Sequence, residues 1–423
     1  MNNNSHHLSP TMPLLRFTTA GSVDDGKSTL IGRLLFDSKS IFEDQLDAIA
    51  LASKRRGESQ INLSLLTDGL RAEREQGITI DVAYRYFSTP RRKFIIADTP
   101  GHFQYTRNVV TGASTAHLAL ILVDARNGIV EQTIRHTFIA SLLGIRHILV
   151  CINKMDLVNF EEGVYLKILS SFQKINGRLG LTNVQFIPIS ALQGDNIVEK
   201  SARMPWYTGK TLLETLEETP AENTTSAKGR FPVQYVIRPD QQKFPDFRGY
   251  AGRVAGGVFY RNQKVIALPS GMKASIQSVI KGTEELETVP NGSSVTISLD
   301  KDIDIGRGSL IVPEKEIPRS ASSLQAMICW FSQIPMHPNG KYLLMHVTGT
   351  YKCRIEEIFF ISDMNTLDEM PGRPLEMNDI GKVRLKLAKP LYFDLYKENR
   401  TTGSFILVDE TTNATIAAGM IEG

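Results

Sequence analysis

Hydrophobic and polar positions alternate in two different ways along the chain, and the change comes near residue 217. Before it, short apolar runs are separated by stretches with helical periodicity. The apolar runs cover residues 14–21, 82–88, 93–99, 117–125, 147–154 and 184–190, and the helical stretches cover 28–36, 131–143 and 161–175. Strands that alternate with helices are typical of βαβ units. We therefore expect a doubly wound α/β domain over 14–217, with a mainly parallel sheet, helices on both faces and a hairpin over 82–99.

Beyond residue 217 the helical periodicity disappears. Residues 217–230 are mostly polar and predict a linker, and residues 311–323 predict a second junction. The intervening and following segments are short β-rich runs separated by Gly, Pro and Asn turns, a pattern that favours small antiparallel barrels. We expect one β-barrel over 230–313, a second over 322–423, and a disordered N-terminus over 1–13.

Composition narrows the class of protein without naming a partner. The chain has 423 residues, a net charge of +3, and 42% hydrophobic and 22% charged residues, values that exclude collagen, disordered chains and small disulfide scaffolds. So balanced a charge gives no reason to expect nucleic acid or a membrane surface as a partner. The longest aliphatic run, 118–123, is far shorter than the ~20 residues of a membrane-spanning helix. Three widely spaced cysteines and a polar, signal-free N-terminus predict a reduced, cytoplasmic setting.

A phosphate-binding loop is predicted between the first strand and the first helix. Two glycines four residues apart are followed by Lys and Ser, in the order Gly21, Ser22, Val23, Asp24, Asp25, Gly26, Lys27, Ser28. Backbone N–H groups at a helix N-terminus converge on phosphates there, and Lys27 adds a positive charge at the β and γ oxygens. The Ser28 hydroxyl can ligate Mg²⁺. A chance glycine turn before a helix is the alternative interpretation.

A second loop has the features of a γ-phosphate sensor. It closes the next parallel strand and reads Asp98, Thr99, Pro100, Gly101, His102. Asp98 can hold Mg²⁺ through water, and the Gly101 N–H can meet the γ-phosphate until hydrolysis removes it. Thr79, which precedes the hairpin, could complete the metal shell with its hydroxyl. Considered by itself, Thr79 is an ordinary strand residue. Together with the two loops it predicts a switch that responds to the γ-phosphate.

Two further loops predict recognition of guanine. The strand that ends near 153 is followed by Asn153, Lys154, Met155, Asp156, and the strand that ends near 190 by Ser190, Ala191, Leu192. Both follow the carboxyl edge of the sheet, where such folds bind ligands. Asp156 can accept two N–H bonds from a guanine edge, a donor pair that adenine lacks. We expect Lys154 to cover the base, Asn153 to brace the phosphate loop, and the Ala191 N–H to address the base carbonyl.

These motifs, in this order, resemble the translation-factor superfamily of GTPases over the whole chain, with a P-loop GTPase domain followed by two barrels. Residues 68–81 are similar to the switch segment of elongation factors. A closer resemblance is to the family of large GTP-binding subunits of bacterial sulfate adenylyltransferase. It is carried by residues 21–28, with Asp25 where translation factors usually have His, and by residues 98–114 and 399–421.

The resemblance implies GTP and Mg²⁺ as cofactors, the latter held by Ser28, Thr79 and Asp98. It implies that His102 orients the attacking water, and that GTP hydrolysis drives a small catalytic subunit, which binds ATP and sulfate and forms adenosine 5′-phosphosulfate and pyrophosphate. A heterodimer is expected, and its further assembly is left open. No second Gly-rich phosphate loop is found in the sequence, which agrees with a transferase centre on another chain. The alternatives are an elongation factor that delivers aminoacyl-tRNA and a nucleotide-locked scaffold without turnover.

Overall fold

The computed structural model describes residues 14–39, 41, 43–55, 61–66, 81–221, 226–238 and 247–423. Thr79 lies outside this part of the chain, as do residues 68–80 of the switch segment 68–81 and the N-terminus 1–13. The chain forms two compact units, Met1–Glu222 with Met364–Leu367, and Asn223–Asp363 with Asp368–Gly423. We describe each unit by itself.

The first unit is built on one six-stranded sheet with the order β2-β3-β1-β4-β5-β6. Its strands are β1 (Leu14–Ala20), β2 (Ala83–Ser88), β3 (Lys93–Asp98), β4 (Leu118–Asp124), β5 (His147–Asn153) and β6 (Asn183–Pro188). All neighbours are parallel except β2, which forms the expected antiparallel hairpin with β3. The expected doubly wound α/β domain is confirmed.

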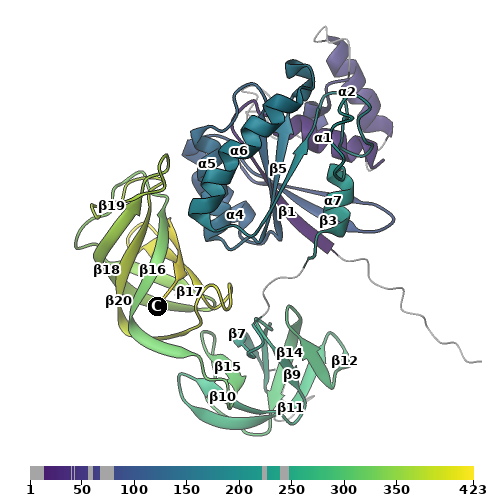
Figure 1. The fold of residues 1–423 in the computed structure, drawn as a ribbon. Helices are drawn as coiled ribbons and strands as arrows, with labels where there is room; N and C mark the ends of the chain where they lie inside the picture. The colour runs from purple at the N-terminus through teal and green to yellow at the C-terminus, as the bar shows by residue number, and fades with distance from the viewer. Residues whose placement is uncertain are drawn as a thin grey trace, which may run out of the picture. The chain divides into compact units, whose positions relative to one another are not determined.

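Helices cover both faces of this sheet (Figure 1). They are α1 (Lys27–Asp37), α2 (Glu43–Arg55), α4 (Thr106–Ala113), α5 (Glu131–Leu142), α6 (Glu162–Leu179) and α7 (Leu212–Glu218), with short 3-10 turns η1 (Leu63–Leu66), η2 (Phe103–Tyr105) and η3 (Met155–Val158). Leu34 of α1 and Leu216 of α7 are buried in one cluster with Phe17 and Leu120 of the sheet. Figure 1 shows α4, α5 and α6 on the opposite face. Every residue of β4 is buried, as a central strand between two helical layers requires.

The close packing of α1 depends on a glycine. A Cβ added at Gly32 would lie 2.2 Å from the Leu63 carbonyl oxygen of η1, far inside van der Waals contact. Only glycine therefore allows α1 to lie against η1 here. This contact fixes the helix whose first turn carries Lys27 and Ser28.

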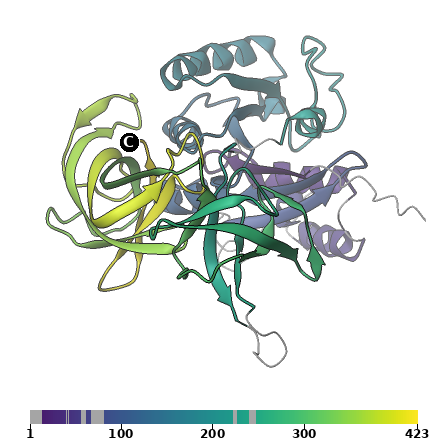
Figure 2. The ribbon, with the colours of Figure 1, turned by 90° about the horizontal axis from the view of Figure 1, so that it is seen from below.

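The second unit contains two closed antiparallel barrels (Figure 2). Six strands of the first barrel form the ring β10-β15-β7-β8-β14-β11, closed by pairing of β10 with β11. Its strands are β7 (Phe231–Ile237), β8 (Gly249–Arg253), β9 (Val258–Tyr260), β10 (Lys264–Leu268), β11 (Met272–Lys281), β12 (Glu284–Glu285), β13 (Thr288–Pro290), β14 (Ser294–Leu299) and β15 (Leu310–Pro313). A ring closed in this way leaves those six strands no unpaired edge.

The second barrel is the ring β17-β21-β22-β16-β20-β18, closed by pairing of β17 with β18. Its strands are β16 (Arg319–Trp330), β17 (Tyr342–His346), β18 (Gly349–Ser362), β19 (Glu369–Pro371), β20 (Ile380–Phe393), β21 (Ser404–Asp409) and β22 (Thr415–Ile421). β16 begins at Arg319, inside the stretch that we expected to be a junction, because its polar start pairs with the end of β20. The apolar run 341–361 is a hairpin of β17 and β18, with its turn at Val347 (φ 49°).

Candidate functional site

The four loops singled out in the sequence follow the carboxyl ends of β1, β3, β5 and β6. These strands lie in one sheet, and β1, β4, β5 and β6 are successive parallel neighbours. Parallel strands bring the loops that follow them to the same sheet edge. The structure therefore brings the predicted site residues of these four loops to one edge of the sheet. Thr79, the remaining predicted site residue, lies outside the described residues.

The phosphate loop leads directly into α1. Gly26 takes the helix N-cap position with φ 92°, a conformation that side chains rarely adopt. The ammonium group of Lys27 donates to the carbonyls of Gly21 (2.9 Å) and Ser22 (2.8 Å). Burial lowers the pKa of Lys27, and Asp98 and Asp25 oppose that shift. The start of the loop thus folds back onto the ammonium group of Lys27, and the loop ends at the N-terminus of α1.

Asp25 is a buried carboxyl inside this loop. Its Oδ2 accepts the Ser22 N–H at 2.5 Å, and its exposed fraction is 4%. Burial raises the pKa of Asp25, although the charge of Lys27 opposes the change. The loop thus places a buried carboxyl against the Ser22 N–H and near the charge of Lys27.

The Asp98–His102 loop packs against the phosphate loop. Asp98 Oδ1 accepts from the Thr19 hydroxyl at 3.1 Å, and the Thr99 hydroxyl donates to the Thr19 carbonyl at 2.5 Å. A Cβ added at Gly101 would lie 2.5 Å from Lys27 Nζ and 2.7 Å from the Gly21 carbonyl oxygen. Only glycine therefore permits this approach, which puts the Gly101 backbone next to the phosphate-binding lysine. Pro100 continues this buried loop.

His102 follows Gly101 and is half-buried. Its Nδ1 accepts the Gln104 N–H at 3.3 Å, so a neutral ring carries its hydrogen on Nε2. The ring centroid lies 6.1 Å from that of Tyr105. The imidazole is therefore held beside the loop that approaches Lys27, with a ring N–H able to donate.

The described residues of the site offer few oxygen ligands for Mg²⁺. Among the described residues no group of three or more His, Cys, Asp or Glu could hold a metal ion. Ser28 offers a hydroxyl on the first turn of α1, and Asp98 offers a carboxylate whose Oδ1 is held by Thr19. One hydroxyl and one carboxylate fit an ion that keeps waters and takes its other ligands from phosphates, as Mg²⁺ does.

Asn153 connects the phosphate loop with the loop after β6. Its amide nitrogen donates to the Asp25 carbonyl at 2.7 Å, and its Oδ1 accepts the Ala191 N–H at 2.9 Å. The Ala191 N–H, which the sequence assigns to the base carbonyl, thus donates to Asn153 in this structure. Both bonds are buried, so the two loops are joined by one side chain with both polar ends satisfied.

Lys154 and Asp156 lie on either side of Met155, which is fully buried. Lys154 adopts φ 64° and its ammonium contacts the Asp24 carbonyl and, at 3.0 Å, Asp124 Oδ2. Ser190 donates its hydroxyl hydrogen to Asp156 Oδ1 at 2.6 Å. That bond fixes the carboxylate through one oxygen and leaves the other available to accept from a ligand.

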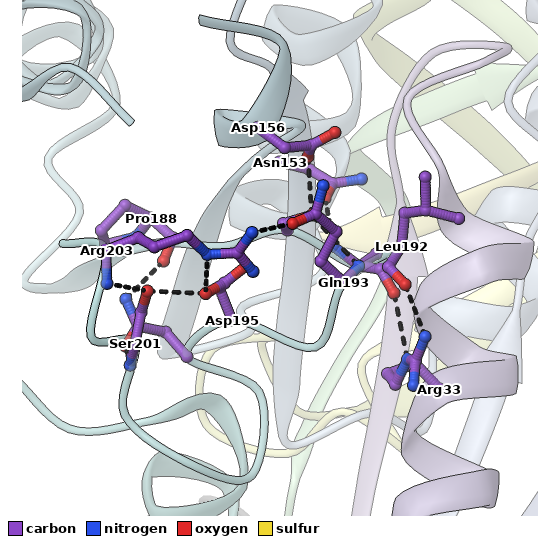
Figure 3. A network of polar contacts seen from close by, with 12 residues as sticks. Arg33, Asn153, Asp156, Pro188, Leu192, Gln193, Asp195, Ser201 and Arg203 are labelled. Atoms are coloured by element: carbon purple, nitrogen blue, oxygen red, sulfur yellow. Dashed lines mark hydrogen bonds and ion pairs between the residues drawn. The ribbon is translucent and has the colours of Figure 1, made fainter. Parts of the chain in front are cut away.

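Three further residues support the site and were missed in the sequence: Arg33, Asp124 and Arg203. Arg33 on α1 donates to the carbonyls of Ala191 and Leu192, and Arg203 contacts Gln193 and Asp195 (Figure 3). Asp124 ends β4 and pairs with Lys154 and Arg126. Burial opposes its ionisation, but hydrogen bonds from Arg126 and Lys154 hold the pKa of Asp124 at about 2. Of these three residues, only Arg33 could have been noticed in the sequence, because it lies on the predicted helix that begins at Ser28.

Comparison with known proteins identifies the class and then the family. The model of the elongation factor Tu GTP binding domain matches residues 12–221, and the GTP-eEF1A C-terminal domain-like model matches residues 323–422. The fold and the loops thus define a GTPase of the translation-factor class.

Curated proteins that are about half identical to this chain carry a more specific name than the two domain models. Sulfate adenylyltransferase subunit 1 of Bacteroides fragilis is 50% identical over 411 residues, which cover 96% of this chain and 86% of that protein. The Alteromonas mediterranea protein of the same name is 51% identical over 413 residues, again 96% and 86% of the two chains. The bifunctional enzyme CysN/CysC of Rhodopirellula baltica is 49% identical over 413 residues, 96% of this chain and 63% of that protein.

The chain belongs to the sulfate adenylyltransferase subunit 1 family, and the resemblance inferred from the sequence is confirmed. A solved structure of sup35 complexed with GDP is 20% identical with a TM-score of 0.44, over 100% of this chain and 97% of that one, a likeness too low to bear on function. No helix among the described residues is long and apolar enough to cross a membrane.

Proposed function

We propose that this chain binds GTP with Mg²⁺ and hydrolyses it, and that hydrolysis drives a separate small catalytic subunit that makes adenosine 5′-phosphosulfate and pyrophosphate from ATP and sulfate. The observation that carries the proposal is the connection of the phosphate end to the base end through Asn153, which bonds Asp25 and Ala191 at once. Such a preformed frame fits a nucleotide that must reach from a helix N-terminus to a carboxylate.

The roles of the phosphate-side residues follow from their positions. Lys27 is held by two backbone carbonyls, and it can exchange these for β and γ oxygens, a better match for its charge. Ser28 and Asp98, with Thr79, would hold Mg²⁺, which would supply charge neutralisation at the β and γ phosphates. The Gly101 N–H would address the γ-phosphate and would lose that contact after hydrolysis.

On the base side, Asp156 would accept the two N–H donors of guanine, while Ser190 holds one of its oxygens. Lys154 would cover the ring with its stem while its ammonium stays with the Asp24 carbonyl and Asp124. The loop Ser190, Ala191, Leu192 would supply the N–H for the base carbonyl. Since Asn153 uses the Ala191 N–H here, we assign the contact with the base carbonyl to the neighbouring Leu192 N–H.

His102 would orient the attacking water through its ring N–H. Phosphoryl transfer through a loose transition state needs a positioned nucleophile more than a strong base. If the partner binds one conformation of the Asp98–His102 loop more tightly than the other, hydrolysis of GTP would be coupled to adenylyl transfer. We place both subunits in the cytoplasm, in line with the three buried free cysteines.

The test is nucleotide binding followed by single-turnover hydrolysis, with the purified chain alone and with its catalytic partner. We expect binding of GDP and GTP by the chain alone, slow hydrolysis, and faster hydrolysis with the partner. Binding without turnover in either sample would leave a nucleotide-locked scaffold and would contradict the proposal. Formation of adenosine 5′-phosphosulfate by the chain alone would contradict the assignment of adenylyl transfer to the partner.

A further inference from the structure

The loop that would read the base is held from outside by two arginines, Arg33 on α1 and Arg203 a few residues beyond the loop. Arg33, on α1, donates from Nε to the Ala191 carbonyl at 3.2 Å and from Nη2 to the Leu192 carbonyl at 2.5 Å. Arg203 approaches the same loop from the other direction, as Figure 3 shows. We propose that Arg33 and Arg203 are positioning residues for guanine recognition, which deepens the proposed function and rests on it.

The two carbonyls held by Arg33 determine where two N–H groups point. In a trans peptide the C=O and N–H bonds point in opposite directions. A guanidinium that fixes the Ala191 carbonyl therefore turns the Leu192 N–H away from α1, and one that fixes the Leu192 carbonyl does the same for the Gln193 N–H. A planar guanidinium with several N–H donors can hold both carbonyls at once, which a lysine ammonium cannot do in a fixed geometry.

The Gln193 N–H passes this orientation on to Asp156. It donates to the Ser190 hydroxyl oxygen at 3.2 Å, and that hydroxyl donates to Asp156 Oδ1 at 2.6 Å. Each bond of such a chain polarises the next. Arg33 thus stands at one end of a series of contacts that ends on the carboxylate proposed to read guanine.

Arg203 fixes the other side of the loop. Its guanidinium bonds both oxygens of Asp195, at 3.2 and 2.5 Å, and also contacts the Gln193 side chain. The same group lies over the Phe160 ring, 4.6 Å from its centroid. Phe160 follows η3, and its N–H donates to the Met155 carbonyl at 2.8 Å. Arg203 therefore ties the loop after β6 to the segment that carries Asp156.

The position of Arg33 also connects the base to the phosphates. It lies on α1, the helix whose first turn contains Lys27 and Ser28, so a shift of that helix would move both carbonyls that it holds. Asn153 provides the second tie between the same two ends. Two independent ties make the phosphate loop and the base loop one rigid frame.

The experiment compares GDP affinity in Arg33→Met, Asp156→Asn and the double variant, each as the full chain. If Arg33 acts through base recognition, Arg33→Met should weaken GDP binding about tenfold in the parent. The same substitution should weaken GDP binding by a smaller factor in Asp156→Asn, because only the orientation of the Leu192 N–H is then left to lose. Asp37→Asn is the matched control, since it removes the partner that Arg33 has on its own helix (3.7 Å) and leaves both carbonyl bonds. It should bind GDP as the parent does.

Two more variants keep the test decisive. Arg33→Lys keeps the charge but cannot hold both carbonyls, so it should fall between the parent and Arg33→Met and remains available if the latter does not fold. Arg203→Met should likewise weaken GDP binding in the parent more than in Asp156→Asn. Unchanged GDP affinity in folded Arg33 variants, or an equal loss with and without Asp156, would overturn the inference. Failure of the parent to bind GDP would instead overturn the proposed function.

Discussion

Arg230 and Asp394 form a bidentate ion pair in the interior of the second unit, with Nε and Nη2 each 2.8 Å from a carboxylate oxygen. Arg230 directly precedes the first strand of one barrel, and Asp394 directly follows β20 of the other. The remaining donors are also used, because Arg230 Nη1 contacts the carbonyls of Gly229 and Glu316, both at 2.7 Å, and Thr402 donates to Asp394 at 2.6 Å. The pair therefore joins the two barrels.

Breaking this pair should be costly. Asp394→Asn leaves the fully buried Arg230 charge without its counter-ion, and we expect the unfolding free energy to fall by about 3–5 kcal/mol. Denaturant unfolding followed by the fluorescence of buried Trp330, in a Trp206→Phe background, reports on this unit. Arg319→Met, which breaks the half-exposed Arg319–Glu398 pair, is the control and should cost less than about 1 kcal/mol. Equal effects of the two changes would show that the buried pair does not hold the barrels together.

Acid should destabilise the first unit in two separate pH windows. Burial, with Lys27 and Arg135 nearby, lowers the pKa of His136 to about 3 from a usual 6.5. The unfolded chain therefore binds a proton below pH 6.5 that the folded chain excludes, and stability falls as pH decreases from there. The Asp124 pKa of about 2 lies below its usual 3.8, so the stability that the ionised carboxylate contributes is lost only as pH falls through about 4 to 2.

The two windows can be separated by substitution. His136→Gln should reduce the pH dependence of unfolding between about pH 6.5 and 4, where His147, whose pKa burial also lowers, still contributes. Asp124→Asn should reduce it only below about 4. Trp206 fluorescence in a Trp330→Phe background is the readout. A parental slope between pH 6.5 and 4 in His136→Gln would contradict the assignment of a neutral buried imidazole.

Base choice should follow Asp156. Asp156→Asn exchanges a double acceptor for an amide that presents donors, so one guanine N–H would face another N–H, at a cost of about 1–3 kcal/mol or more. Xanthine nucleotides present an acceptor at that position and should become the preferred ligands. Competition of GDP and XDP for the variant measures the change, and retained preference for GDP would sink the assignment of Asp156 to the base.

Substitutions of Lys27 and His102 should affect different steps, nucleotide binding and GTP hydrolysis respectively. Lys27→Ala removes the buried cation of the phosphate loop and should lose nucleotide affinity. His102→Ala should keep GTP affinity and lose hydrolysis, because an oriented water is needed in the transition state and not for binding. Equilibrium binding and single-turnover hydrolysis with the partner distinguish the two. Parental hydrolysis by His102→Ala would remove its catalytic role.

The parts of the fold that the sequence predicted depend on local pattern. The apolar run 117–125 predicted the strand observed as β4, and the glycines at 21 and 26 predicted the turn into α1. What could not be predicted depends on contacts between distant residues. Arg33 lies 158 positions from Ala191, and Arg230 lies 164 from Asp394, so no local spacing connects either pair. The start of β16 at Arg319 was missed for the same reason, since a polar segment becomes a strand there only through its pairing with β20.

The most direct test of the account measures pyrophosphate release from ATP and sulfate by this chain reconstituted with its catalytic partner. The reaction is run with GTP, with GDP and with a non-hydrolysable GTP analogue. If hydrolysis drives adenylyl transfer through the Asp98–His102 loop, GTP should give the highest rate, and His102→Ala with GTP should fall to the rate with the analogue. Equal rates with all three nucleotides would mean that GTP is only structural and would contradict the account.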